Sequence, residues 1–498
     1  MATVEANWQV EFEAWLAPFL ARLRRAEQRR WAPIYLQGLL GPGERKSVEP
    51  MAARVAPGDV QQLHPFISTS PWTCEPLEEE LVHAAERLLG GPDAVLVIDD
   101  TALVKQGRHS VGVARQYCGQ LGKKANCQAL VSLTLARAEV PVCVGLRLFL
   151  PRAWAEDVAR RTRAGVPETI LSRPKWQIAL DELDRIVAAG ASFGCVLADA
   201  EYGKAAEFRH GLSKRDLTFA VGILPNQKVY PADVAIAPAP VRATGRPPKH
   251  PVPSVKSKSA EALFAALPEA AWQTISWRRG TKGDLRAAFA ALRVRVADGA
   301  VMSGAQHLPG EEAWLVCERR VSGERKYYLA NHAEDVPLES LAATLKARWV
   351  CEQAHQQMKE ELGLDHFEGR SWLGLHHHVL MTMIAFAFLQ HLRLGGKNHD
   401  QHGTAAPAIT AAGATSSRRR SDLAGAALPA LPPARALPPP TMILAEVVLE
   451  PVSKLSWGLL RSQTRSRIGC NLDPPLTLNK LTCQPLDRYR GFGREFRH

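Results

Sequence analysis

The chain has 498 residues, 46% of them hydrophobic and 22% charged, and carries a formal net charge of +12. This composition excludes a largely disordered chain and leaves room for roughly two to four folded domains. The basic excess indicates a polyanionic partner, either nucleic acid or an acidic membrane surface.

The other compositional signals point to the cytoplasm. No apolar run reaches the length that we expect of a membrane span, and the acidic, amphipathic N-terminus is not typical of a secretory signal. Nine scattered cysteines without a CxxC pair favour reduced thiols over a zinc site or a disulfide framework. We therefore expect a cytoplasmic protein with no membrane partner.

Residues 1–90 are predicted to form a helical DNA-binding domain. Trp8, Phe12, Trp15 and Phe19 recur at helical spacing, and arginines follow them. The break at residues 56–58 separates two further helical segments, which makes a helix-turn-helix possible. A small helical bundle with solvated arginines fits the pattern equally well.

Residues 91–225 alternate strands with helices and are predicted to be the first part of a catalytic core. The apolar run 94–98 is followed by Asp99 and Asp100, and the run 193–197 leads to Asp199. Two β-rich segments lie between these runs, and a helix is expected over residues 175–188. The pattern is that of an α/β fold with a mixed sheet.

The remaining segments are assigned by composition and periodicity. Residues 226–335 are expected to contain a basic, Pro-rich arm and an inserted β-rich subdomain, and 336–395 are expected to form two helices that complete the core. Residues 396–440 are predicted to be a disordered linker, and 441–498 are a basic tail of unknown structure. Within the arm, Arg246 and Lys249 belong to a Gly-Arg-Pro segment similar to minor-groove hooks, although a plain linker fits as well.

Two aspartates and one glutamate carry the predicted chemistry. Asp100 and Asp199 each follow an apolar strand, and active groups gather at the carboxyl ends of strands in α/β sheets. Mg²⁺ prefers carboxylate oxygens, and two such ions can clamp the attacking and leaving oxygens of a phosphoryl transfer. Arg348, Glu352 and Lys359 fall on one helix face, where the acid can bind metal and the cations can bind phosphate. A solvated ion-pair stripe is the alternative.

These segments resemble a known family. VIDDT (ending at Thr101), LADAEYG and Arg348-x3-Glu352-x6-Lys359 are similar to the three motifs of DDE transposases, in the insertion-sequence branch whose third motif reads Tyr-x2-Arg-x3-Glu-x6-Lys. The resemblance covers about residues 30–395. The tyrosine position of the motif falls on Leu345, so any role of that tyrosine is lost or supplied elsewhere, for example by Tyr327 or Tyr328.

The resemblance implies a ribonuclease H-like core with a β-rich insertion, and a catalytic and metal-binding triad of Asp100, Asp199 and Glu352. Two Mg²⁺ (or Mn²⁺) ions would be the cofactors. Asp100 is preferred to Asp99 because the motif places the acid immediately before Thr101, and Asp99 and Glu201 are kept as flanking acids that could substitute.

The predicted function is that of a homodimeric cut-and-paste DNA transposase, associated with the nucleoid. Its partners would be the double-stranded DNA of transposon ends and of the target. The expected DNA contacts are Arg348, Lys359, Lys105, Arg115, Lys123, Lys124, Arg246 and Lys249. The alternatives are a catalytically decayed DNA-binding relative, a ribonuclease H-like nuclease without transposition, and a simple repressor.

Overall fold

The computed structural model describes residues 2–238, 251–280, 283–303 and 306–402. The Gly-Arg-Pro segment with Arg246 and Lys249 and the basic tail 441–498 lie outside the described residues. The predicted linker 396–440 does so too, except that its first residues continue the last helix to His402.

Five helices precede the sheet, and their apolar faces share one core. Phe12, Leu16 and Phe19 of the first helix are buried, at the spacing that the sequence shows. The break at residues 56–58 separates the third helix from the fourth, which begins after Asp59. The five helices are α1 (Ala2–Ala21), α2 (Ala26–Leu40), α3 (Val48–Val55), α4 (Val60–Ser68) and α5 (Glu75–Leu89).

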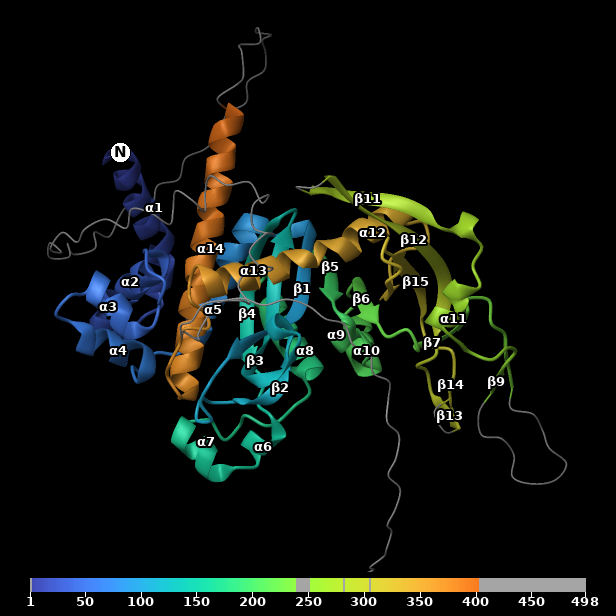
Figure 1. Cartoon of the computed structure of the whole chain (residues 1–498), viewed down its shortest axis with the longest axis horizontal. Helices are drawn as coiled ribbons and strands as arrows, with labels where there is room; N and C mark the ends of the chain where they lie inside the picture. Colours follow the sequence, from blue (N-terminus) through green and yellow to red (C-terminus); the bar gives the residue numbers. More distant parts are fainter. Residues whose placement is uncertain (1, 239–250, 281–282, 304–305, 403–498) are drawn as a thin grey trace, which may run out of the picture. The chain divides into compact units, whose positions relative to one another are not determined.

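Within the described residues one large sheet of 12 strands runs through the protein (Figure 1). Its order is β10-β7-β12-β15-β16-β6-β5-β1-β3-β2, with β4 also paired to β3 and β11 to β12. The strands of the first part are β1 (Gly91–Val104), β2 (Ala114–Cys118), β3 (Lys123–Arg137), β4 (Val140–Leu148), β5 (Phe193–Ala198) and β6 (Phe219–Ile223).

The strand β1 lies between β3 and β5 in this sheet. It pairs antiparallel with β3 and parallel with β5, and β5 pairs parallel with β6. The prediction that this strand ends at the aspartates was wrong: Asp99 and Asp100 lie inside β1, because β3 continues to pair with it as far as Val104. Asp199, in contrast, directly follows β5.

The inserted segment continues the same sheet instead of forming a detached one. Its strand β16 pairs antiparallel with β6, so the hydrogen-bonded ladder passes from the first part into the insertion without a break. Its strands are β7 (Lys228–Pro231), β10 (Lys258–Ser259), β11 (Gln273–Gly280), β12 (Gly283–Val296), β15 (Glu312–Arg319) and β16 (Arg325–Ala330); two small pairs, β8 (Ile236–Ala237) with β9 (Val252–Pro253) and β13 (Val301–Ser303) with β14 (Gln306–His307), lie beside it.

Short helices connect these strands. The helix predicted over residues 175–188 is α8, with those bounds. The connecting helices are α6 (Arg152–Ala155), α7 (Val158–Ala164), α8 (Lys175–Ala188), α9 (Ala200–Gly203), α10 (Ala206–Ser213) and α11 (Ala260–Ala265), and two short 3₁₀ turns are η1 (Gly119–Leu121) and η2 (Glu269–Ala271).

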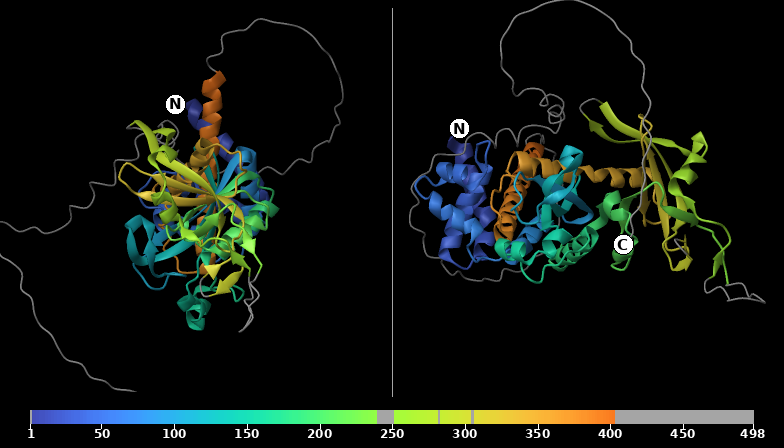
Figure 2. Two further views of the ribbon diagram at one scale, coloured as in Figure 1. Left: turned by 90° about the vertical axis from the view of Figure 1, so that its right-hand side faces the viewer. Right: turned by 60° about the horizontal axis from the view of Figure 1, so that its bottom comes forward.

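Three helices follow the insertion. The first of the two helices predicted within residues 336–395 is split at Arg348 into α12 (Leu338–Ala347) and α13 (Trp349–Glu360). Helix α13 crosses the sheet and contacts β1 and β4, whereas α12 packs on β11 and β12 of the insertion (Figures 1 and 2). The two helices thus connect the insertion to the centre of the sheet.

The last helix, α14 (Trp372–His402), packs on β4 and on α2, α4 and α5. Contrary to the expectation from sequence, its segment Trp372–Gly395 is long and apolar enough to cross a membrane, with a mean hydropathy of 1.4. However, 89% of that segment is buried inside the protein, as in the core helix of a globular fold.

Candidate active site

The register of β1 and β5 places two aspartates side by side. Ile98 is level with Ala198, so the next residues, Asp99 and Asp199, are level as well. Side chains alternate between the faces of a strand. Asp99 therefore shares a face with Asp199, and Asp100 points to the opposite face.

The apolar neighbours agree with this division. Val97 and Leu197, two residues before Asp99 and Asp199, share a hydrophobic cluster with Val350 and Cys351 of α13. Ile98 and Ala198 belong instead to the larger core on the other side. The face that carries Asp99 and Asp199 is thus the face that α13 covers.

Asp99 is bound directly by the start of α13. Arg348 donates to its Oδ2 atom, and the thiol of Cys351 lies 3.2 Å from the same atom. The backbone N–H of Asp100 donates to Oδ1 at 2.7 Å. Burial raises the pKa of Asp99, and the charge of Arg348 opposes that shift.

Asp199 caps helix α9. Its Oδ1 atom accepts the backbone N–H groups of Glu201 at 2.9 Å and Tyr202 at 3.3 Å. Burial, followed by the negative charge of Asp99, raises the pKa of Asp199 to about 6. The negative charges of Asp99 and Asp199 therefore repel each other, and nearby positive charge does not offset the free-energy cost of burying the Asp199 carboxylate.

Glu352 lies one helical turn after Arg348, and its side chain is 60% exposed. Arg348 forms an ion pair with Glu352 and another with Asp99. The guanidinium of Arg348 thus joins Glu352 of α13 to Asp99 of β1. Asp199 lies close enough to raise the pKa of Arg348. The start of α13 thus places Arg348 between two acids, Asp99 on β1 and Glu352 on α13.

Asp100 has a different environment on the opposite face. Its Oδ2 atom forms an ion pair with Lys175, at the start of α8. Its Oδ1 atom accepts a hydrogen bond from the buried hydroxyl of Tyr202 at 2.6 Å. Both oxygens are therefore held by the protein itself.

The donor set suits a hard divalent cation, because Asp99, Asp199 and Glu352 offer only carboxylate oxygens. In the part of the chain that the structure describes, however, no three His, Cys, Asp or Glu side chains converge as a ready metal site. Arg348 binds two of the three carboxylates and places a positive charge between them.

The predicted DNA contacts fall into three environments. Lys105 donates to the backbone carbonyls of Asp365 at 3.1 Å and Phe367 at 2.7 Å, so its ammonium supports a loop and is not free for phosphate. Lys359 is half-buried in the last turn of α13. Arg115, Lys123 and Lys124 are exposed on the β2–β3 hairpin. At the position of the motif's tyrosine, Leu345 is buried, and of the two tyrosines considered as substitutes, Tyr327 is buried and Tyr328 donates to Glu318 at 3.0 Å.

Four residues of the site's surroundings were not predicted from the sequence. Tyr202 lies in the LADAEYG segment, three residues after Asp199, which is the only hint of its role. Lys175, Cys351 and His355 carry no such hint; His355 bonds Ser132, the cross-strand neighbour of Asp99, at 2.8 Å. Their contacts depend on pairings between segments far apart in the chain.

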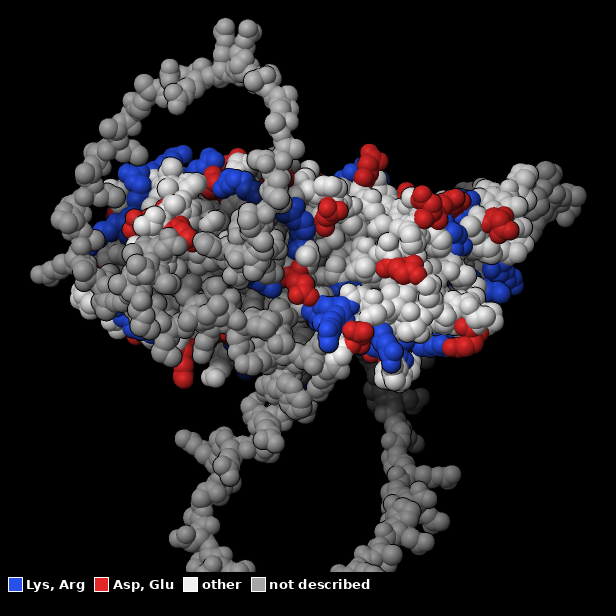
Figure 3. Space-filling model, turned by 90° about the horizontal axis from the view of Figure 1, so that it is seen from above, with Lys and Arg blue, Asp and Glu red and all other residues white. Residues whose placement is uncertain are grey.

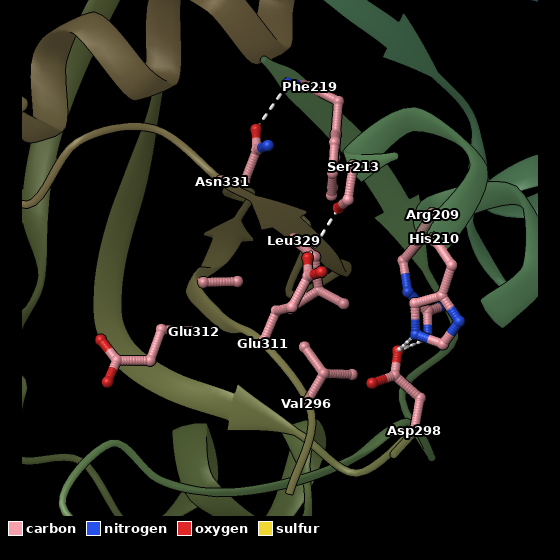
Figure 4. Close-up of a pocket in the computed structure, with 11 residues that line it drawn as sticks. Arg209, His210, Ser213, Phe219, Val296, Asp298, Glu311, Glu312, Leu329 and Asn331 are labelled. Carbon is pink, nitrogen blue, oxygen red and sulfur yellow. Dashed lines mark hydrogen bonds and ion pairs between the residues drawn. The ribbon is translucent and has the colours of Figure 1, made fainter. Parts of the chain in front are cut away.

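A small cavity lies between α10 and the insertion (Figure 4). Its volume of about 20 Å³ admits about one water molecule, so it is not a substrate site. Arg209 is buried and donates to Asp298 at 2.6 Å, and Ser213 donates to Glu311 at the same distance. These bonds join the first part of the chain to the insertion.

We expect Asp298→Asn to lower the free energy of unfolding by about 2 kcal/mol, because the amide weakens a charged hydrogen bond to a buried guanidinium. Urea unfolding measures the change. Glu312→Gln is the matched control, since that carboxylate is half-exposed and pairs with Arg293 at the protein surface. Equal effects in both variants would refute a special role for the buried pair.

Comparison with known proteins adds three findings. The chain matches the family described as DDE superfamily endonuclease over residues 18–284, more than half of its length. This match includes Asp99, Asp100 and Asp199 and ends before Glu352.

The chain is 28% identical over 220 residues to the "Probable transposase for insertion sequence element IS701" of Microchaete diplosiphon. The alignment covers 44% of this chain and 54% of that protein, so it spans about half of the relative's length. Among solved structures, piggyBac transposase in its synaptic complex with hairpin DNA aligns over 80% of this chain and 74% of that chain, with a TM-score of 0.39 and 9% identity.

Proposed function

The chain belongs to the DDE superfamily endonucleases, and from this premise we propose that it is a DNA transposase that cuts and rejoins DNA strands at the ends of an insertion sequence. The relative named as an insertion-sequence transposase supports the choice of transposition over simple nuclease activity. The observation that carries the proposal is the face shared by Asp99 and Asp199, which α13 covers and where Arg348 links Asp99 to Glu352.

The proposed triad is Asp99, Asp199 and Glu352. It differs from the assignment made from sequence, which used Asp100. Asp100 faces the other side of the sheet, and both of its oxygens already bind Lys175 and Tyr202. Asp99, in contrast, lies level with Asp199 and next to α13. We assign Asp100 the structural role of fixing β1 against α8 and α9.

The proposed cofactor is a pair of Mg²⁺ or Mn²⁺ ions, which when bound would stabilise the attacking and leaving oxygens. The residues themselves supply position and charge. The N–H groups of α9 orient Asp199, while Arg348 orients Asp99 and Glu352. In the first reaction, water attacks phosphorus and the 3′-oxygen leaves as a hydroxyl. In the second, that 3′-hydroxyl attacks the phosphorus of a target phosphodiester, and the 3′-oxygen of the target strand leaves.

The proposed catalytic core is ribonuclease H-like. Strands β4, β3, β1, β5 and β6 follow one another across the sheet, with β3 antiparallel to β1 and to β4, and with β5 and β6 parallel to β1. Such a core accounts for carboxylates on two adjacent parallel strands and a third on a covering helix. The domain assignment follows it: α1–α5 as the end-binding domain, β7–β16 as the insertion, and α12–α14 as the closing helices.

The proposed partners are the transposon ends and the target DNA, bound by a homodimer in the cytoplasm. On the face seen in Figure 3, basic and acidic side chains are interspersed, so the net charge alone does not mark a DNA path there. The proposed phosphate contacts near the triad are Arg348 and Lys359, and Arg246 and Lys249 are proposed for the minor groove.

The test uses the full-length protein with a duplex that carries the inverted repeat bracketing the gene. We expect Mg²⁺-dependent nicking at the repeat end, then joining of the freed 3′-end to a plasmid, because both steps need the carboxylate-bound cation. Chelation by EDTA should stop both reactions and leave binding intact. Binding without nicking would indicate a decayed relative or a repressor, and nicking without joining would indicate a nuclease.

A further inference from the structure

A two-stranded ribbon extends beyond the end of β1. Val104, the last residue of β1, is level with Cys127, so the part of β3 that precedes Cys127 pairs only with β2. The ribbon comprises residues 114–126, with the turn η1 at its tip. Strand β2 pairs only with β3 among the described strands, so its outer edge is open.

The register assigns one face of this ribbon to the catalytic side. Asp99 is level with Ser132, whose hydroxyl bonds His355 of α13. Every second residue of β3 shares that face, so Lys124 does as well. Tyr117 is level with Lys124, and Arg115 lies two residues before Tyr117 on the same side. Arg115, Tyr117 and Lys124 therefore form a row on the face of the sheet that holds Asp99.

This row has the chemistry of a nucleic-acid surface. Tyr117 is 66% exposed, and both cations beside it are exposed. Within the described residues neither Arg115 nor Lys124 forms an ion pair, and the sequence has no Asp or Glu from residue 101 to residue 138. A strand edge can be protected by lysines alone, but that role does not call for an exposed aromatic ring between them.

We propose that the face formed by Arg115, Tyr117 and Lys124 binds duplex DNA, with the two cations on phosphates and the tyrosine ring against deoxyribose and base edges. A two-stranded ribbon fits the major groove of DNA. Eight residues of β3 separate Ser132 from Lys124, a path of about 26 Å along the strand at its ordinary rise, and the contact of η1 with β1 shows that the ribbon curves along this path. The surface lies on the side of the triad away from the insertion.

The proposal rests on the proposed function for the identity of that DNA, which is either the donor sequence flanking the element or the target. Both are duplexes, so the recognition chemistry is the same. Binding to a duplex of arbitrary sequence tests the surface itself. Cleavage of ends with long or short flanks, and joining to a plasmid, then separate the two sources.

The first experiment measures Kd by fluorescence anisotropy over a series of salt concentrations. Arg115→Ala and Lys124→Ala should each lower the slope of log Kd against log salt by about one, because each removes one phosphate contact. Tyr117→Ala should weaken binding about tenfold at every salt concentration without changing the slope, and Tyr117→Phe should restore it. Lys214→Ala is the control, because this exposed lysine follows α10 and lies outside the ribbon.

Unchanged slopes in Arg115→Ala and Lys124→Ala, in variants that melt at the wild-type temperature, would overturn the proposal. Equal changes in Lys214→Ala would do the same, because they would indicate a general charge effect. The test separates the two proposals. If the wild type cuts transposon ends but the ribbon variants bind DNA normally, only the proposed DNA-binding role of the ribbon is refuted. If binding depends on the ribbon but no cutting occurs, only the proposed transposase activity is refuted. If Tyr117→Ala loses cleavage only on long flanks, the donor flank is the ligand; if it loses only joining, the target is.

Discussion

Asp99→Asn is expected to reduce Mg²⁺-dependent cleavage at least about a thousandfold, whereas Asp100→Asn should stay within about tenfold of wild type. A metal-binding carboxylate contributes several kcal/mol to the transition state, and each 1.4 kcal/mol is about a factor of ten in rate. The amide of Asn keeps the size of the side chain but loses the charge. Gel assays of nicking on the element end measure both rates.

The two variants also differ in stability, which gives an independent readout. Asp100→Asn weakens the ion pair with Lys175 and a hydrogen bond from Tyr202, so we expect a loss of roughly 1–3 kcal/mol in the free energy of unfolding. Asp199→Asn, in contrast, should not destabilise the metal-free protein, because burial and Asp99 already disfavour its charge. Inactive Asp100→Asn with active Asp99→Asn would return the catalytic role to Asp100.

The sequence predicted which strands and helices carry the site better than it predicted which face of a strand each side chain points to. Strand and helix periodicity is local, so the sequence predicted the strand that leads to Asp199, the helix that carries Glu352 and the bounds of α8. The choice between Asp99 and Asp100 depends on a strand's face, and a one-residue difference reverses it. That face is set by the pairing of β1 with β3 up to Val104, a contact between segments that no local pattern encodes.

Long-range contacts are a further part of the structure that the sequence did not reveal. The helix predicted as continuous is interrupted at Arg348, which keeps helical backbone angles and whose side chain binds Asp99 of β1. Lys105 was placed on DNA because basic residues surround it in the sequence, yet it supports the loop that follows α13. Arg348 and Lys105 each bind a residue more than two hundred positions away in the sequence. Local sequence patterns cannot reveal such a partner.

A buried ion-pair network joins the N-terminal helices to the core. Arg147 of β4 donates to both carboxylate oxygens of Glu78 in α5 at 2.5 Å, and its Nε atom donates to Glu182 in α8 at 2.6 Å. Burial alone would raise the pKa of Glu78, but the hydrogen bonds and charge of Arg147, with the charge of Arg185, hold that pKa below its ordinary value. The network therefore couples three elements through one guanidinium.

Arg147→Met should lower the free energy of unfolding by about 3–5 kcal/mol, because it leaves the buried Glu78 with only the more distant charge of Arg185, at 3.9 Å. Adding Glu78→Leu should recover much of that loss, since it removes the stranded charge. Arg152→Ala is the control: its side chain is 85% exposed in a surface pair with Glu156, so we expect less than about 0.5 kcal/mol. Urea unfolding midpoints measure all three changes.

The pH dependence of Arg147→Met separates lost charge pairing from lost packing. In the wild type the pKa of Glu78 is depressed, so its stabilising contribution is present above the unfolded pKa and is lost as the pH falls through the folded pKa. Without Arg147, burial raises that pKa, and protonation then removes the unpaired charge. The difference in stability between wild type and Arg147→Met should therefore narrow as the pH is lowered from neutral towards about 5. A difference that stays constant over this range would assign the loss to packing of the arginine side chain and not to the ion pair.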